Sequence, residues 1–176
     1  MGREYCSCIL AMITQNIPFG AIDSFNVLVE IPEGSKVKYE YSKEQDILVA
    51  DFMLIGETVW PFNYGEIFGT LGGDGDRLDA IVISTHPLLP GSVVACRAIG
   101  MAEIVDRGQE DNKIICVPNI DRDKGNCTDL DSLSEEQIRN FNDFFIELAA
   151  QKNKIMEVKG WHTRERAEEE LKKARV

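Results

Sequence analysis

Three carboxylates lie within six residues in the segment Asp74-Gly-Asp-Arg-Leu-Asp79. Like charges on a tight turn repel one another, so the segment costs stability unless a positive charge lies among them. Hard divalent cations prefer oxygen ligands and would supply that charge. The loop Trp60–Glu66 precedes the turn, and the uncharged, β-branched run Ala80–Ser84 that follows is typical of a buried strand. The turn therefore has the composition of half of a metal site.

A second acidic cluster, Asp106–Asp111, precedes another apolar run, Lys113–Val117. Either cluster alone could equally be a solvated turn, because Asp and Gly favour turns for conformational reasons. Two clusters, each at the edge of a strand, favour one shared site for polyvalent metal. The spacing does not match a calcium-binding EF-hand loop, which needs Asp at alternating positions and a Glu twelve residues in.

Length and charge limit the classes of protein to consider. A chain of 176 residues with 44% hydrophobic content forms one domain and can bury a full core without disulfides. The net charge of −11 argues against nucleic-acid binding, which requires a basic face for the phosphate backbone. An acidic protein that acts on an anion must import positive charge, and bound metal ions do that.

The five cysteines are odd in number and are expected to be free thiols: Cys6, Cys8, Cys96, Cys116 and Cys127. Free thiols indicate a reducing, cytoplasmic compartment. The apolar run 8–13 is too short to span a membrane, and Arg3-Glu4 is not the basic region of a signal peptide. We therefore expect no targeting segment and no membrane partner.

Short strands separated by turn signals predict a small antiparallel β-barrel, with strands at 26–31, 36–42, 47–53, 79–84, 92–100, 113–117 and 155–159. A helix is predicted behind the capping box formed by Ser134 and Gln137. Apolar residues recur along it at helical spacing: Ile138, Phe141, Phe144, Phe145 and Leu148. A last helix from Thr163 onward puts Ala167, Leu171 and Ala174 on one stripe. The expected fold class is α+β, a single domain over residues 1–176 with helices packed outside the barrel.

Six motifs occur in the order and approximate spacing of the soluble family I inorganic pyrophosphatases, which the chain resembles over roughly residues 15 to 175: Val29-Glu-Ile-Pro32, Lys38-Tyr-Glu40, Pro61-Phe-Asn-Tyr-Gly65, Asp74-Gly-Asp-Arg-Leu-Asp79, Leu89-Pro-Gly91 and Glu110-Asp-Asn-Lys113. The acidic turn together with the upstream Pro61–Gly65 motif is the most specific part. The resemblance implies an OB-like barrel that hydrolyses inorganic diphosphate to two phosphates with a metal-activated water. It also implies several Mg²⁺ ions, or Mn²⁺ in their place, and a homo-oligomer, since bacterial-type chains of this size are commonly hexamers.

Residue roles follow from the same resemblance. Asp74, Asp79 and Asp111 would hold the metals flanking the attacking water, and Asp106 would share a further ion with Asp111. Asp76 would be the general base. Glu30 and Glu40 match acidic positions that orient metal-bound water, and Glu30 is counted with the metal site. Lys38, Lys113 and Tyr64 match residues that contact phosphate oxygens. Taken singly, these glutamates could form the wet face of a sheet and these lysines could be solvated edge residues.

The chain departs from the family where the family binds the second phosphate. Asp51 stands in place of an Arg, Trp60 in place of a Tyr, and Arg77 in place of the Pro of the acidic turn. A Tyr-Lys pair falls on Phe145-Ile146 if no gap shifts the alignment. A carboxylate cannot replace the two hydrogen bonds that an Arg donates to a phosphate.

These departures predict weak diphosphatase activity. No Arg or Lys lies between Lys43 and Arg77, so Arg77 is expected to be the only new cation near the site. Two alternatives remain open from the sequence. One is a catalytically impaired relative that keeps the metal site as a binding or structural subunit. The other is a hydrolase of another phosphate ester or anhydride.

Overall fold

The computed structural model describes residues 17–176. Ten strands and two α-helices follow one another in the order β1 Gly20–Ala21, β2 Ser24–Ile31, β3 Val37–Ser42, β4 Ile47–Met53, β5 Asn63–Ile67, β6 Asp79–Val82, β7 Val93–Asp106, β8 Gln109–Glu110, β9 Lys113–Pro118, α1 Glu135–Gln151, β10 Met156–His162 and α2 Arg164–Ala174, with a 3-10 turn at Leu130–Ser132 before α1. Cys6, Cys8 and the apolar run 8–13 lie outside the described residues. No helix in the described part is long and apolar enough to cross a membrane.

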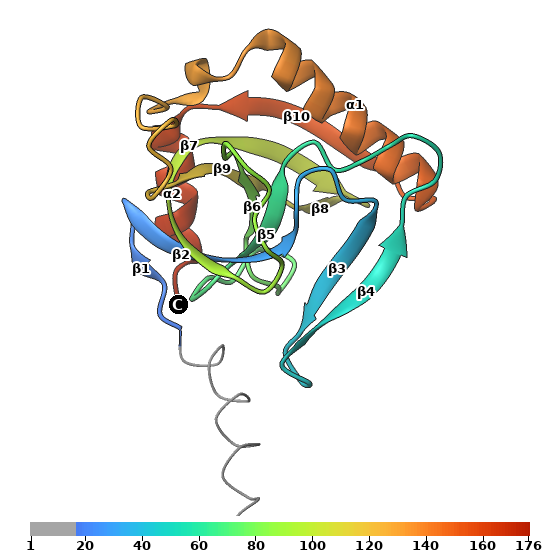
Figure 1. Ribbon diagram of the computed structural model, residues 1–176, viewed down its shortest axis with the longest axis horizontal. Coiled ribbons are helices and arrows are strands. Elements are labelled where there is room, and N and C mark those ends of the chain that lie inside the picture. The colour runs from blue at the N-terminus through green and yellow to red at the C-terminus, as the bar shows by residue number, and fades with distance from the viewer. Residues whose placement is uncertain (1–16) are drawn as a thin grey trace, which may run out of the picture.

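Five strands close into the predicted barrel (Figure 1). They pair in the order β2, β5, β6, β9 and β7, and β7 pairs with β2 to close the ring. β10 extends the sheet beyond β7. The barrel with helices outside it is confirmed, but one of its strand pairs, β6 with β9, is parallel rather than antiparallel. A parallel pair cannot be joined by a tight hairpin, and here β7 lies between the two strands in the chain and supplies the long connection.

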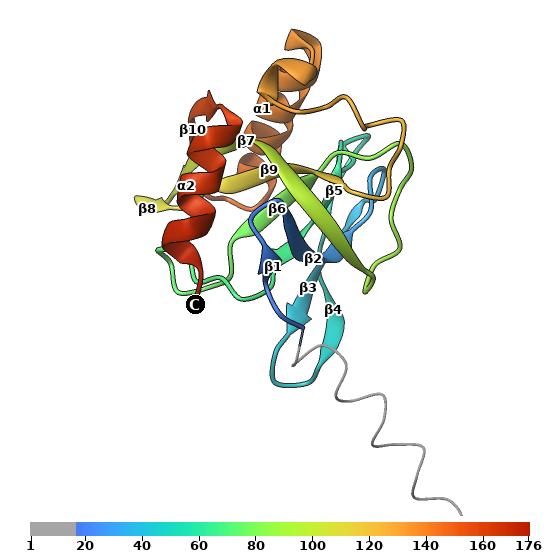
Figure 2. The ribbon, with the colours of Figure 1, turned by 90° about the vertical axis from the view of Figure 1, so that its left-hand side faces the viewer.

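Strands β3 and β4 form a separate two-stranded sheet that projects from the barrel (Figures 1 and 2). A bulge lies between Lys38 and Tyr39, because Lys38 pairs with Phe52 while Tyr39 pairs with Ala50. Asp51 is therefore the extra residue opposite this step, and a bulge of this kind redirects a side chain away from the regular alternation.

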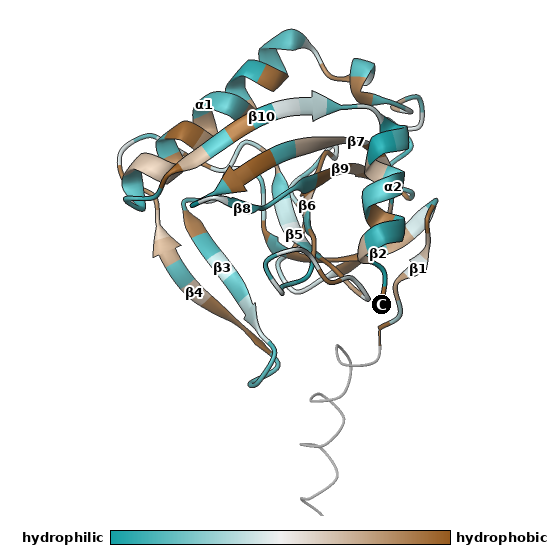
Figure 3. Cartoon of the chain, turned by 180° about the vertical axis from the view of Figure 1, so that it is seen from behind, coloured by the Kyte–Doolittle hydropathy of each residue, from teal (hydrophilic) through white to brown (hydrophobic). Residues whose placement is uncertain are grey.

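Apolar side chains gather in two clusters, one on each side of the barrel sheet. The first includes Val27, Val29 and Met101 with the buried stripe of α2, Ala167 and Leu171. The second packs the opposite strand faces against α1 and includes its phenylalanines, Phe141, Phe144 and Phe145. Figure 3 shows both helices with hydrophilic surfaces broken by apolar stretches. The two predicted helical stripes are thus confirmed.

Local signals at the helix ends agree with the sequence. Ser134 caps α1 by accepting a hydrogen bond from the backbone N–H of Gln137, whose side chain accepts one from the N–H of Ser134.

Cys96 and Cys116 are buried free thiols and Cys127 is a partly buried one, as expected.

Strand β5 is the main element that the sequence did not predict, since its residues were assigned to a loop. All five of its residues are buried. A Cβ added at Gly65 would lie 1.9 Å from the carbonyl oxygen of Leu28 on the neighbouring strand. The glycine is therefore a packing requirement between β2 and β5, and not a turn signal.

Candidate active site

A cavity of about 440 Å³ opens where the acidic turn, the barrel strands and the end of α1 meet. It is lined by all ten residues that the sequence singled out for chemistry: Glu30, Lys38, Glu40, Tyr64, Asp74, Asp76, Asp79, Asp106, Asp111 and Lys113. These residues come from strands β2, β3, β5, β6, β7 and β9 and from two loops. Segments far apart in the chain thus bring one set of polar groups to one place.

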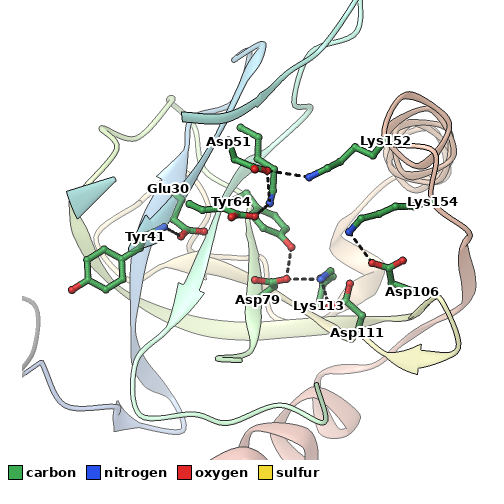
Figure 4. Close-up of polar contacts among 12 residues, drawn as sticks. Glu30, Tyr41, Asp51, Tyr64, Asp79, Asp106, Asp111, Lys113, Lys152 and Lys154 are labelled. Atoms are coloured by element: carbon green, nitrogen blue, oxygen red, sulfur yellow. Dashed lines mark hydrogen bonds and ion pairs between the residues drawn. The ribbon is translucent and has the colours of Figure 1, made fainter. Parts of the chain in front are cut away.

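Asp79 is the centre of the contacts inside this cavity (Figure 4). Its Oδ2 accepts a 2.5 Å hydrogen bond from the hydroxyl of Tyr64 and a further one from the ammonium of Lys113. The Lys113 ammonium also lies 2.5 Å from Oδ1 of Asp111. Asp79 and Lys113 are paired residues of the parallel strands β6 and β9, which is why the two side chains meet.

Burial and charge act together on these groups. Burial alone would lower the pKa of Lys113, but the carboxylates of Asp79 and Asp111 raise it above its ordinary value. Burial raises the pKa of Asp111, although Lys113 opposes the shift. Burial, with the charge of Asp79 beside it, also raises the pKa of Tyr64 well above its usual range. Lys113 thus stays charged and Tyr64 stays a hydrogen-bond donor at neutral pH.

The acidic turn has a defined shape. Gly75 has a φ of +92°, which favours glycine, and the backbone N–H of Asp76 donates a 3.0 Å hydrogen bond to Oδ1 of Asp74. The carboxylate of Asp76 is largely exposed and lies 3.2 Å from the ammonium of Lys43. Asp74 and Asp76 therefore differ in environment, since Asp74 is tied to the turn and Asp76 faces solvent and a cation.

Glu30 is a buried carboxyl, only 7% exposed. Its Oε1 accepts a 2.7 Å hydrogen bond from the backbone N–H of Tyr41. Burial raises the pKa of Glu30 to about 8, and the nearby carboxylates of Glu66 and Asp79 add to the shift while the Tyr41 N–H opposes it. In the absence of a further cation, this group holds a proton at neutral pH.

The cavity residues fit a hard divalent cation. Within residues 17–176 no three acidic, histidine or cysteine side chains already form a ready-made metal cluster. The available donors are nevertheless carboxylate oxygens, which such ions prefer. Oδ1 of Asp106 is buried without a hydrogen bond, although Nε of Arg107 lies 3.4 Å away, and its Oδ2 lies 3.0 Å from the ammonium of Lys154. Lys113 supplies positive charge between Asp79 and Asp111, where a cation would otherwise be needed.

Two lysines that follow α1, one at its C-cap and one in the loop before β10, were missed by the sequence analysis. Lys152 and Lys154 line the cavity, so Arg77 is not the only new cation there. Arg77 pairs with Glu66 and its guanidinium lies over the ring of Phe68, 4.7 Å from the centroid. A helix end can deliver lysines to a distant strand surface only through the tertiary fold, which the local sequence does not reveal.

The positions expected to replace the Tyr-Lys pair need a correction. Trp60 and Phe145 line the cavity, but Ile146 does not and is 64% exposed. Leu148 and Ala149, one helical turn further on, line it instead. Asp51 does not line the cavity either, but it contacts two lysines that do, Lys38 and Lys152.

Comparison with known proteins gives a consistent result. Residues 27–176 match the family model for inorganic pyrophosphatase. The inorganic pyrophosphatase of Saccharolobus solfataricus is 42% identical over 159 residues, which cover 88% of this chain and 91% of that protein. That of Synechocystis is 39% identical over 136 residues, covering 77% and 80%. The solved structure of the Helicobacter pylori inorganic pyrophosphatase superposes with a TM-score of 0.83 at 37% identity, covering 88% and 92% of the two chains.

Proposed function

This chain belongs to the family I inorganic pyrophosphatases and hydrolyses inorganic diphosphate to two phosphates, and we propose how the residues of its cavity divide that work. The observation that carries the proposal is that ten residues selected from the sequence line one cavity. A hydrolase of another phosphate ester, or an inactive relative that keeps the site, is not favoured by the relatives.

The acidic side chains are proposed to hold divalent metal ions, Mg²⁺ or Mn²⁺ and several in number: Asp74, Asp79, Asp106, Asp111 and Glu30. When bound, such ions lower the pKa of an attacking water and neutralise charge on phosphate oxygens. To bind them, Asp79 and Asp111 must exchange part of their contact with Lys113. The ammonium of Lys113 then becomes available to an anion in the cavity.

Asp76 is proposed to accept the proton of the attacking water. Its carboxylate lines the cavity, is largely exposed and can pass a proton to solvent. Its Oδ1 lies 3.2 Å from the ammonium of Lys43. Glu40, which lies beside Lys38 at the cavity wall, is proposed to orient water.

Lys38, Lys113 and Tyr64 are proposed to bind phosphate oxygens. All three present N–H or O–H donors to the same cavity. Lys113 and Tyr64 donate to Asp79 in the empty cavity, and their donors would become available to an anion there when Asp79 ligates a metal ion. Oriented donors stabilise the charge that spreads over the phosphoryl oxygens in the transition state.

Assembly and location are also part of the proposal. We expect a cytoplasmic homo-oligomer, as in the hexamers common in this family, acting on a small anion without nucleic-acid or membrane partners. Sedimentation of the purified protein measures the first point, since a monomer has a mass of 19.8 kDa.

The test is release of phosphate from diphosphate by the purified protein at neutral pH, with Mg²⁺ or with excess chelator. We expect hydrolysis that requires the metal and that Asp79→Asn abolishes. Asp123→Asn, an exposed change in the loop after β9, is the matched control and should leave hydrolysis intact. Equal rates with Mg²⁺ and with chelator would contradict the metal assignment, and equal rates for Asp79→Asn and the control would contradict the role of Asp79.

A further inference from the structure

One carboxylate outside the cavity holds two lysines that line it (Figure 4). Oδ2 of Asp51 lies 3.0 Å from the ammonium of Lys152 and 3.5 Å from that of Lys38. Both lysine side chains are 18% exposed, whereas that of Asp51 is 35% exposed. The three residues come from α1, β3 and β4, so the contact joins the projecting hairpin to the helix end.

The backbone keeps Asp51 in this position. It is the extra residue of the bulge in the β3–β4 pair, so its side chain does not follow the regular alternation of side chains between the two faces of the strand. Lys38 faces it from the neighbouring strand. A β-bulge changes the direction of a single side chain, and here that side chain is the carboxylate of Asp51, which lies between Lys38 and Lys152.

Lys152 is held in place by its position at the C-terminal end of α1 and by nearby contacts. It is the C-cap residue of α1, where the negative end of the helix dipole favours a cation. Its ammonium lies 5.4 Å from the centroid of the Phe52 ring. The preceding residue, Gln151, exchanges two hydrogen bonds with the backbone of Ile55, at 2.8 and 3.3 Å. Lys152 is therefore fixed at the cavity wall by several contacts, rather than being a mobile surface lysine.

We propose that Lys152 is a phosphate-binding residue and that Asp51 is an internal anion that competes with phosphate for Lys152 and Lys38. The proposal rests on the diphosphatase function. With the cavity empty, the ammonium of Lys152 is directed to Asp51, and that of Lys38 is shared between Glu40, its nearer partner, and Asp51. A phosphate group in the cavity, which carries more negative charge than a carboxylate, draws them away from Asp51.

This exchange has a direct consequence for product release. Because Asp51 takes back the two ammonium groups when phosphate leaves, it offsets part of the attraction that would retain the product. Removing the charge of Asp51 should therefore strengthen phosphate binding, while removing the charge of Lys152 should weaken it. If Asp51 only positioned the lysines, its removal would weaken phosphate binding too, so the two roles predict changes of opposite sign.

The experiment measures binding of inorganic phosphate to the Mg²⁺-loaded protein by calorimetry, together with inhibition of diphosphate hydrolysis by phosphate. We expect Lys152→Gln to weaken phosphate binding by on the order of 10-fold or more, and Lys152→Arg to restore most of it. Asp51→Asn should tighten binding several-fold. Lys159→Gln is the matched control, because Lys159 is an exposed lysine paired with Glu157 on β10 outside the cavity, and it should bind phosphate as the wild type does.

The double variant Asp51→Asn/Lys152→Gln separates direct from indirect action. If Lys152 touches phosphate, Lys152→Gln should weaken binding in the Asp51→Asn background as well. The same background keeps the test valid if the single variant fails to fold because Asp51 is left unpaired. Unchanged phosphate binding in the Lys152 variants, or weaker binding in Asp51→Asn, overturns the inference. Absence of diphosphate hydrolysis by the wild type would instead overturn the function on which it rests.

Discussion

Asp79 links three other polar side chains of the cavity. It joins the Tyr64 hydroxyl, the Lys113 ammonium and, through Lys113, the Asp111 carboxylate. The carboxylate of Asp76, in contrast, is largely exposed and lies 3.2 Å from the ammonium of Lys43. At the residue scale, this difference in contacts is the reason for proposing different roles for the two carboxylates.

Asp76→Asn should therefore lower the turnover number strongly while leaving metal affinity near that of the wild type. The substitution keeps the size of the side chain but removes its ability to accept a proton, a contribution typically worth about 10²- to 10⁴-fold in rate. Steady-state kinetics and calorimetric Mg²⁺ titration of the same preparations measure the two quantities. Asp123→Asn serves again as control, and wild-type turnover in Asp76→Asn would exclude Asp76 as the base.

The buried Glu30 makes the stability of the metal-free protein depend on pH. Its pKa is about 8 in the folded protein against an ordinary value of 4.5, so the folded state binds this proton more tightly than the unfolded chain. The free energy of unfolding should then fall as pH rises from about 4.5 to about 8, by at most about 1.4 kcal/mol per pH unit.

Urea unfolding in chelator across this range measures the effect. Glu30→Gln should flatten the fall in stability, whereas Glu33→Gln, an exposed change three residues along, should keep it. Identical pH profiles for Glu30→Gln and the wild type would mean that Glu30 does not carry this proton.

At the scale of elements, local patterns predicted most of the secondary structure but not the placement of α1 or the existence of β5. Strand β4 and the start of α1 agree with prediction, because alternation and capping are local signals. Pro61, Asn63 and Gly65 look like turn residues, yet Asn63 and Gly65 are buried in β5 by neighbours on both sides. An alignment without gaps places Ile146 at the phosphate site, but it ignores which face of α1 meets the barrel, and Ile146 is 64% exposed.

The placement of α1 also explains why the cation supplied by Lys152 could not be deduced from the sequence. Lys152 reaches the cavity only because α1 ends beside the β3–β4 hairpin, where it meets Asp51. The predicted weak activity rested on the loss of two cations and stays a prediction. Lys152 supplies one cation close to that region.

Gly65→Ala tests the close approach of β2 and β5. A methyl group at this position would lie 1.9 Å from the Leu28 carbonyl oxygen, so the two strands must separate. We expect a loss of about 1–3 kcal/mol or more in the free energy of unfolding, measured in urea. Gly73→Ala is the control, since its added methyl would meet nothing closer than Glu110 Cβ at 4.0 Å, and it should change stability by less than about 0.5 kcal/mol. Equal effects of the two variants would contradict the packing role of Gly65.

For the molecule as a whole, the net charge of −11 and the many carboxylates of the cavity mean that folding gathers negative charge. Part of this charge is neutralised internally by basic side chains, among them Lys38, Lys43, Arg77, Lys113, Lys152 and Lys154. A divalent cation that binds the folded state but not the unfolded chain therefore stabilises the fold by mass action.

Millimolar Mg²⁺ should consequently raise the melting temperature. At a concentration 100 times the dissociation constant, one site contributes about 2.7 kcal/mol, which corresponds to several degrees for a domain of this size. Differential scanning calorimetry measures the shift, and Asp79→Asn should abolish most of it while Asp123→Asn keeps it. A melting temperature that does not respond to metal in the wild type would remove the basis for the metal site.

Closure of the barrel between β2 and β7 also affects how fast the cavity can form during folding. Phe25 pairs with Cys96, and β7 then pairs with β9 and β10, so the contacts that complete the ring join distant parts of the chain. The chain loses conformational entropy on closing such loops before it gains the favourable energy of the strand contacts. Folding of β-rich topologies is therefore slow, on a scale of about milliseconds to seconds. Because the cavity takes residues from β2 and from the segment after α1 as far as Met156, its wall cannot form until these distant segments have folded together.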